Sequence, residues 1–184
     1  MILNRSYRNS LFIYYSTLFL IFTLIILGYM FKREKEYRIE TLDDELINIT
    51  KIVDNYIVKN SIESSGNFHN IDSLISLFPQ SNLRVTVMKR DGVVVYDSFV
   101  DNWGEMENHL SRPEVQESLN EEYGTNVRNS ETTGESYYYL ANNFRDFIVR
   151  AAVVYDITVV NFLKARLFFL IVIFMVFVVF GGIL

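Results

Sequence analysis

Residues 83–98 read LRVTVMKRDGVVVYDS, and this stretch decides the fold class. Apolar and polar side chains alternate in LRVTVMKR, as they do along a strand with one buried face. The β-rich run VVVYDS follows, and the Asp91-Gly92 pair between the two runs is favoured in two-residue turns. We therefore predict an antiparallel hairpin of strands 83–90 and 93–98 joined by a two-residue turn.

Downstream of the hairpin, a helix and three more strands are predicted. Ser111 and Glu114 have the spacing of a helix capping box, Pro113 falls in the first turn, and Gly124 lies just beyond the last turn. The predicted strands are 125–130, 135–142 and 147–154, with turns at 131–134 and 143–146. From Asp156 a further helix is predicted to lead through Lys164 and Arg166 into the second apolar segment. One five-stranded antiparallel sheet flanked by helices, an α+β fold, buries the apolar faces of these elements.

Upstream of the hairpin, a long helix is predicted over 32–59. No Pro or Gly interrupts residues 31–65, and apolar residues recur there at 3-4-3-4-3 spacing. The stripe suits a dimerising or signalling contact with a partner helix. Packing on the domain's own sheet explains it equally well, because Ile52 and Ile57 broaden the stripe into a wide apolar face. Its members are Ile39, Leu42, Leu46, Ile49, Val53 and Tyr56. A loop over 61–70 follows, and Asn70 is the predicted N-cap of a short helix, 71–78.

Two uninterrupted apolar segments bracket this region. Residues 11–31 and 167–184 contain no charged side chain, and as helices each crosses most or all of a ~30 Å hydrocarbon core. A cleaved signal peptide has a shorter apolar region and a small-residue cleavage site, which the first segment lacks. We predict two transmembrane helices, 11–31 and 167–184, around one sheet-bearing domain, 32–166, with residues 1–10 as an N-terminal tail.

The charged residues concentrate in the predicted domain. Residues 32–166 contain all 22 acidic residues and 15 of the 17 basic ones, a net charge of −7, which argues against nucleic acid as a partner. The other two, Arg5 and Arg8, favour a cytoplasmic N-terminus and an extracytoplasmic domain by the positive-inside rule. The chain has no Cys, so it has neither disulfides nor thiolate metal sites.

Short motifs occur in a fixed order through the domain. They are Asp91-Gly92, Asp97-Ser98, Met106-Glu107-Asn108-His109, Arg112-Pro113-Glu114, Gly124, Arg128 and Ser130. In this order, over roughly residues 83–153, they resemble the extracytoplasmic sensor of membrane-bound histidine kinases, above all the phosphate-regulon-type sensor kinases. The resemblance implies a PAS-like (Cache-related) domain between two spans. The Asn142-Asn143 pair departs from the family, which usually has an apolar or Val-Pro pair after the fourth strand.

The resemblance also implies a function and partners. In such proteins a homodimeric sensor in the bacterial cytoplasmic membrane detects a small-molecule or protein stimulus and controls a cytoplasmic kinase, which phosphorylates a response regulator. ATP and Mg²⁺ belong to that kinase part, and no cofactor is expected in these residues. A chemoreceptor or a cyclic-dinucleotide enzyme can carry the same kind of sensor. A non-signalling, membrane-tethered scaffold or binding protein is the alternative of a different class.

No catalytic residue or metal ligand set is predicted, because the sequence contains no nucleophile–base arrangement, Gly-rich phosphate loop or zinc motif. The candidate ligand-binding residues are His109, Arg112, Arg128, Tyr139 and Arg150. His109 either joins a pH-sensitive or metal site or fixes its loop by hydrogen bonding. Arg128 and Arg150, on predicted strands, either capture an anion through paired N–H groups or form exposed or internal ion pairs. Tyr139 either lines a pocket or packs in the core.

Overall fold

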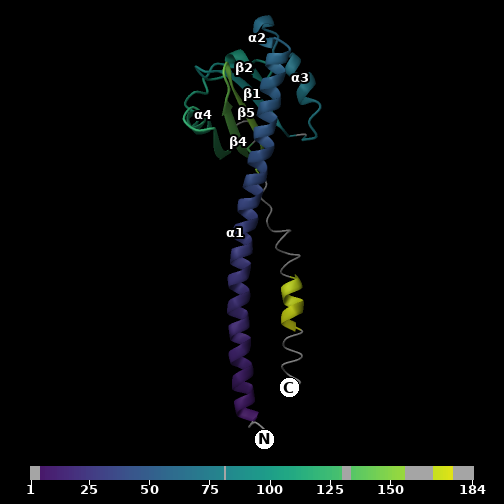
Figure 1. The fold of residues 1–184 in the computed structure, drawn as a ribbon, viewed down its shortest axis with the longest axis vertical. Helices are drawn as coiled ribbons and strands as arrows, with labels where there is room; N and C mark the ends of the chain where they lie inside the picture. The colour runs from purple at the N-terminus through teal and green to yellow at the C-terminus, as the bar shows by residue number, and fades with distance from the viewer. Residues whose placement is uncertain (1–4, 81, 130–133, 156–167, 176–184) are drawn as a thin grey trace. The chain divides into compact units, whose positions relative to one another are not determined.

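The computed structural model describes residues 5–80, 82–129, 134–155 and 168–175 (Figure 1). The chain divides into two units, one of Met1–Ile39 with Ile157–Leu184 and one of Glu40–Asp156. The described helices are α1 (Arg5–Lys59), α2 (Ile62–Ser65), α3 (Asn70–Ile75), η1 (Trp103–Glu105), which is a 3-10 helix, and α4 (Pro113–Ser118). Residues 168–175 are also helical. The predicted helix after residue 156 lies outside the described residues, as does most of the predicted span 167–184.

Helix α1 joins two predicted elements, the apolar segment 11–31 and the long helix 32–59, without a break. An 18-residue window of this helix has a mean hydropathy of 2.2, and none of it is buried. By length and composition α1 is therefore able to cross a membrane, and it is the one helix within the described ranges that passes this test. Its last residue, Lys59, is the predicted one.

The sheet has five antiparallel strands, as predicted, and the α+β class is confirmed (Figure 1). The strands are β1 (Arg84–Lys89), β2 (Val94–Asp97), β3 (Tyr123–Asn129), β4 (Ser136–Asn143) and β5 (Phe147–Val154), in the spatial order β2-β1-β5-β4-β3. The chain therefore completes the sheet by inserting β5 between the first hairpin and the β3–β4 pair. Asn142 and Asn143 are the last two residues of β4, so this strand ends one residue later than predicted.

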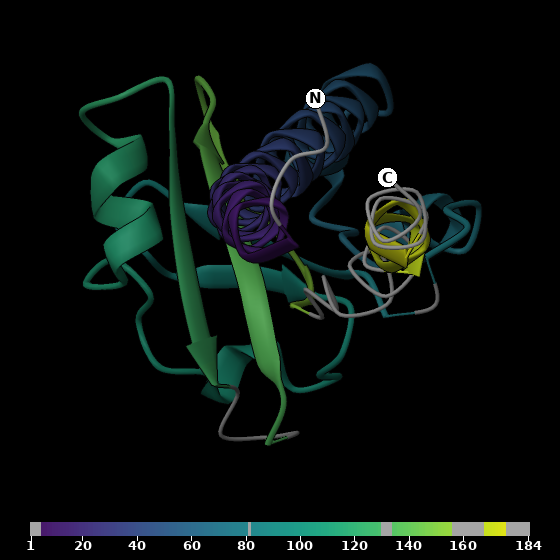
Figure 2. The same cartoon turned by 90° about the horizontal axis from the view of Figure 1, so that it is seen from below.

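Helices cover the two faces of the sheet, and Figure 2 shows α4 and the later part of α1 on opposite sides of it. The face toward α1 is apolar, and the Tyr138 hydroxyl on β4 donates a hydrogen bond to the Asp43 carboxylate on α1. Buried side chains that alternate to this face include Val85, Val87, Leu140, Val149 and Ala151. On the other face, α4 packs against β3 and β4. Val115 of α4 contacts a cluster of Met88, Ala141 and Ile148 there.

The turn of the first hairpin differs from the prediction. The Lys89 amide donates to the Val93 carbonyl at 2.9 Å, and the Gly92 amide donates back to the Lys89 carbonyl at 2.9 Å. The loop therefore has three residues, 90–92, and Gly92 takes a left-handed conformation with φ +84°. A three-residue loop with glycine in that conformation is the next most common hairpin connection after the two-residue turn, and both favour an Asp-Gly pair.

The predicted capping box at the start of α4 is wrong. Arg112, not Ser111, is the N-cap, with an extended backbone (φ −68°, ψ 135°), because the ring of Pro113 disfavours a helical conformation at the preceding residue. Glu114 does not return to the cap, and its side chain is fully buried instead. The helix ends at Ser118, so Gly124 is not its terminator but a buried residue of β3.

Two upstream predictions are corrected as well. The predicted loop 61–70 contains the one-turn helix α2, whose first residue, Ile62, is fully buried. The predicted helix 71–78 is α3, in which Asn70 is the first helical residue and not the N-cap. After Ile75 the backbone tightens, since the Leu77 and Phe78 amides bond to carbonyls three residues earlier.

Candidate functional site

The candidate site is a group of polar side chains on the face of the sheet that α4 covers. The strand registers pair Thr86 with both Asp97 and Arg150, so these three side chains project from the same face. We call the whole group the arginine cluster. Its members are Arg84, Thr86, Asp97, His109, Arg112, Glu114, Arg128, Tyr139 and Arg150.

The centre of the cluster is a buried ion pair between strand and helix. The Arg150 Nη1 on β5 donates to the Glu114 Oε1 on α4 at 3.2 Å, and the two side chains are 2% and 0% exposed. The other terminal nitrogen, Nη2, donates to the Thr86 hydroxyl at 3.1 Å. Glu114 thus neutralises a cation that the sheet would otherwise bury without a partner, which is the reason this carboxylate tolerates complete burial.

A second ion pair continues the network toward β2. The Asp97 carboxylate accepts from the Arg84 Nε at 3.1 Å and from the Thr86 hydroxyl at 2.8 Å. It also accepts from the Phe99 backbone amide at 2.9 Å. Thr86 therefore links the two ion pairs, because its hydroxyl accepts from Arg150 and donates to Asp97. Such a connected network holds β1, β2 and β5 in one arrangement.

His109 and Arg112 come from the loop before α4, and the hairpin turn fixes this loop. The His109 amide donates to the Gly92 carbonyl at 2.9 Å, and the Asn108 side-chain amide donates to the Asp91 carbonyl at 2.8 Å. A Cβ atom added to Gly92 would lie 2.3 Å from the Asn108 Oδ1. The turn therefore has to carry glycine for the loop to approach this closely.

The Tyr139 ring lies beside two of the arginines. The guanidinium carbons of Arg128 and Arg150 are 4.7 Å and 5.0 Å from its centroid, within the range of cation–π attraction. Tyr139 itself is 2% exposed and packs with Tyr137 and Ala152. Core packing, one of the two predicted alternatives for Tyr139, is thus confirmed, and its ring also contacts the arginines of the cluster.

Positive charge dominates the cluster. Four arginines face two buried carboxylates, those of Asp97 and Glu114, so the net formal charge of the members is +2 with His109 neutral. Burial, and then the positive charges of Arg150, Arg112 and the other two arginines, lower the pKa of His109 from 6.5 to about 3. His109 is therefore uncharged at neutral pH, and it adds hydrogen-bonding capacity to the cluster without adding charge.

Several buried polar atoms of the cluster have no hydrogen-bond partner. Among the described residues, they are the Nδ1 of His109, the Nε of Arg112, the Oε2 of Glu114 and the Nε of Arg150. Buried polar atoms in folded proteins nearly always have a partner, and each unsatisfied atom reduces stability by about 1–3 kcal/mol. Four such atoms therefore lie together in the cluster, and each needs a water molecule or a ligand as its hydrogen-bond partner.

All five predicted ligand residues lie in this cluster, although the strands, turns and loops that carry them are far apart in sequence. The structure adds Arg84, Thr86, Asp97 and Glu114, which were not predicted as site residues. For Arg84 and Thr86, the alternation along residues 83–90 was a usable signal, because it places both on the face opposite Val85 and Val87. The role of Glu114 could not be predicted in this way, because its spacing from Ser111 matches that of a capping box and therefore indicated a helix cap instead of an ion pair.

The predicted stripe on α1 divides into two parts. Leu46, Ile49 and Val53 are buried within the Glu40–Asp156 unit, together with Ile57. Ile39, Leu42 and Tyr56 are partly exposed, and Ile52 is 45% exposed. The buried part therefore serves the domain's own core, which was one of the two uses left open. No described contact tests the other use, a partner helix.

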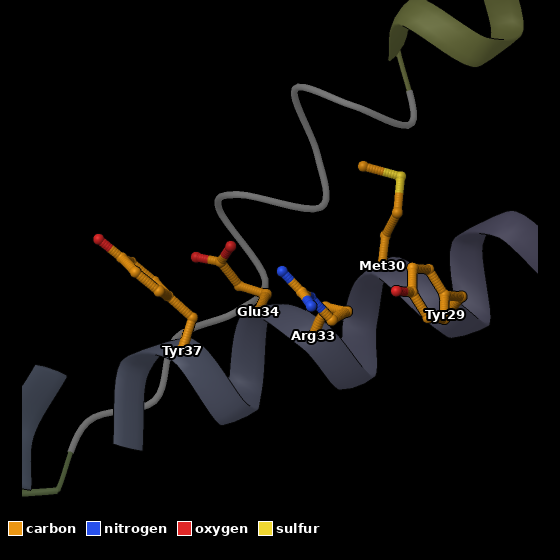
Figure 3. Close-up of a pocket in the computed structure, with 5 residues that line it drawn as sticks. All are labelled: Tyr29, Met30, Arg33, Glu34 and Tyr37. Carbon is orange, nitrogen blue, oxygen red and sulfur yellow. The ribbon is translucent and has the colours of Figure 1, made fainter. Parts of the chain in front are cut away.

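A hollow of about 370 Å³ lies elsewhere on the chain. Figure 3 shows the five residues that line it, Tyr29, Met30, Arg33, Glu34 and Tyr37. All five residues belong to α1, so one helix provides the whole described lining, and this does not enclose a ligand. Tyrosine rings next to charged side chains are typical of a helix at a membrane–water interface. A second hollow lies beside Lys89, Glu63 and Asp146 and contains no predicted ligand residue.

Within the described ranges, no group of three or more His, Asp or Glu side chains is placed to hold a metal ion. No family model, no curated protein and no solved structure matches this chain.

Proposed function

We propose that this chain is the sensor region of a bacterial two-component histidine kinase, held in the cytoplasmic membrane by two spans. Its PAS-like domain lies outside the cytoplasm, forms a homodimer and binds an effector at the arginine cluster. The observation that carries this proposal is the continuity of α1, which runs unbroken from an exposed apolar segment to the buried Leu46, Ile49 and Val53. One continuous helix therefore connects the proposed membrane span to the core of the domain.

The cluster supplies the kind of element that signalling requires. An effector shifts an equilibrium only if it binds one arrangement of the protein better than another. Side chains from the 107–112 loop, from α4 and from all five strands meet in the cluster, so a ligand there changes how α4 packs on the sheet. Arg150 belongs to β5, the last strand before residue 156, and a change at the cluster therefore reaches the second connection to the membrane.

A chimeric receptor tests the signalling role. Residues 1–184 are joined, at seven successive one-residue offsets, to the linker and kinase part of a well-characterised sensor kinase, and transcription of its target reporter is measured. We expect at least one join in which Arg112→Gln changes reporter output severalfold, while Arg145→Gln, an exposed arginine outside the cluster, has no effect. If the parent and both variants give the same reporter transcription at every join, with equal protein levels in the membrane, the signalling role is rejected. The chain would then be a non-signalling binding protein.

The proposed topology is tested separately. Because the chain has no Cys, a single engineered cysteine is the only thiol that a reagent can label. On intact cells, a membrane-impermeant maleimide should label Glu63→Cys and should label Asn9→Cys only after lysis. Labelling of Asn9→Cys on intact cells contradicts the proposed orientation.

A further inference from the structure

We propose that the arginine cluster binds a small oxyanion carrying two negative charges, the charge type shared by phosphate groups and dicarboxylates. The inference deepens the proposed function and rests on it in one respect, the assumption that the bound anion is the effector. The binding itself is argued from the cluster alone.

The first step concerns which arginines already have partners. Arg84 pairs with Asp97, and Arg150 pairs with Glu114, both through buried contacts of 3.1–3.2 Å. Among the described residues, the carboxylate partner of Arg112 is Glu107, at 3.8 Å, and the Glu107 side chain is 89% exposed, so solvent weakens that pair. Arg128 has no carboxylate partner within the described ranges, and its contact is the Tyr139 ring. Two cationic side chains are therefore left without an effective counter-charge.

The second step concerns the unsatisfied donors. The Nε of Arg112 and the Nε of Arg150 are buried without a partner, and both are N–H groups that can only donate. The neutral His109 ring, 5% exposed, presents its Nδ1 in the same region and donates from it in one of its two tautomers. One unsatisfied acceptor, the Oε2 of Glu114, lies among them and repels an anion. The donors and cationic groups outnumber it, so the balance favours a negatively charged acceptor.

The third step concerns access and shape. The Arg112 side chain is 32% exposed and Arg128 is partly exposed, whereas Arg150 and His109 are buried. An anion arriving from solvent thus meets Arg112 and Arg128 first and the buried donors next. Guanidinium groups present N–H pairs that match the oxygens of carboxylates and phosphates. The net charge of +2 is balanced by a ligand with two negative charges, which a chloride or acetate ion does not provide.

The experiment uses the full chain in detergent micelles and measures binding by titration calorimetry at constant ionic strength. The probes are inorganic phosphate, succinate, acetate and chloride. We expect saturable binding of phosphate or succinate and none of acetate or chloride. Arg128→Gln should weaken the bound dianion about ten- to hundredfold, the range for one charged hydrogen-bonding group. Arg145→Gln removes the same charge from the exposed β4–β5 turn and should leave the affinity within about twofold of the parent.

Each outcome decides the inference. Phosphate binding without succinate binding identifies a phosphate-bearing ligand, and the reverse identifies a dicarboxylate. Absence of saturable binding by both dianions overturns the proposal, as does equal weakening in Arg128→Gln and Arg145→Gln. Arg128 has no ion pair within the described ranges, so its substitution should leave the fold intact, and the thermal unfolding midpoint without added anion verifies this. If the chain binds a dianion but Arg112→Gln leaves the reporter output of the chimera unchanged, the anion site stands and the signalling role is rejected. If Arg112→Gln changes the reporter output but no dianion binds, the signalling role stands and the anion site is rejected.

Discussion

Arg150 and Glu114 are 36 positions apart in the sequence, yet they form an ion pair of 3.2 Å in which both side chains are buried. The pair joins the middle of β5 to the first turn of α4 across the face of the sheet. It is the point at which the helix, the strand and the arginine cluster meet, so it governs both the stability of the domain and the state of the site.

Removing the charge of Glu114 should strongly destabilise the domain. Glu114→Gln leaves the Arg150 guanidinium buried without its counter-ion, and a broken buried pair reduces the free energy of unfolding by about 3–5 kcal/mol. Urea denaturation of the full chain, followed by tyrosine and tryptophan fluorescence, measures the loss. Glu121→Gln, at an exposed position, is the matched control and should change stability by less than about 0.5 kcal/mol. A small effect of Glu114→Gln would mean that water replaces the carboxylate.

Gly124→Ala should also be destabilising, for a steric reason. A Cβ at Gly124 would lie 2.1 Å from the Glu114 carbonyl oxygen and 2.7 Å from the Ser118 amide nitrogen, both backbone atoms of α4. Relief requires α4 to move off β3, which we expect to reduce the free energy of unfolding by about 3 kcal/mol. Gly104→Ala meets nothing within 4 Å and is the control. Equal stability of the two variants would contradict the close approach of α4 to β3.

The stability of the domain should depend on His109 in mildly acidic solution. The pKa of His109 is about 3 in the folded chain against an ordinary 6.5, so between these values the unfolded chain binds a proton that the folded chain does not. Stability contributed by neutral His109 is therefore present above pH 6.5 and is lost as the pH falls, by at most about 1.4 kcal/mol per pH unit.

The measurement compares urea midpoints from pH 7 to pH 5 in the parent, His109→Asn and His69→Asn. His109→Asn should flatten the dependence, whereas His69→Asn, which removes the exposed second histidine, should retain it. Asp43 and Asp54, whose pKa values are raised by burial, contribute equally to all three proteins and cancel in the comparison. An unchanged slope in His109→Asn would show that the ring is accessible to protons in the folded chain.

If the homodimer forms through α1, adjacent residues of this helix should differ in cross-linking. Ile52 is 45% exposed, whereas Val53 is fully buried in the domain's own core. Oxidation of membranes containing Ile52→Cys should give a disulfide-linked dimer, and Val53→Cys should give none. Equal cross-linking of the two would mean that the core around Val53 opens. Cross-linking at neither position would place the dimer contact elsewhere.

The sheet was predictable because its strands carry strong local signals. Alternating apolar residues and turn-forming pairs gave all five strands, and the bounds of β5 were predicted to the residue. The errors occur where a tertiary contact overrides a local pattern. Ser111 and Glu114 have capping spacing, but Arg150 attracts the Glu114 carboxylate into the core. Gly124 resembles a helix terminator, but it is glycine because β3 touches α4.

The site was predictable only in its residue types. Arginines on strands indicate either anion binding or ion pairing. Arg150 forms an ion pair, whereas the described residues provide no ion pair for Arg128. Which arginine receives a carboxylate depends on the helix that packs over the sheet, and no local pattern around Arg150 reports that Glu114 will lie 3.2 Å away. Long-range pairing of this kind is visible only once the chain is folded.

The contact of the hairpin turn with the loop before α4 has an evolutionary consequence. Asp91 and Asn108 are seventeen positions apart, yet the Asn108 side chain bonds to the Asp91 carbonyl, and no larger residue fits at Gly92 beside it. A mutation at either end of this contact removes the reason for the residue at the other end. In descendants and relatives of this chain, the two motifs should therefore be inherited and lost together, and Asn108 should vary freely only where Gly92 has already been replaced.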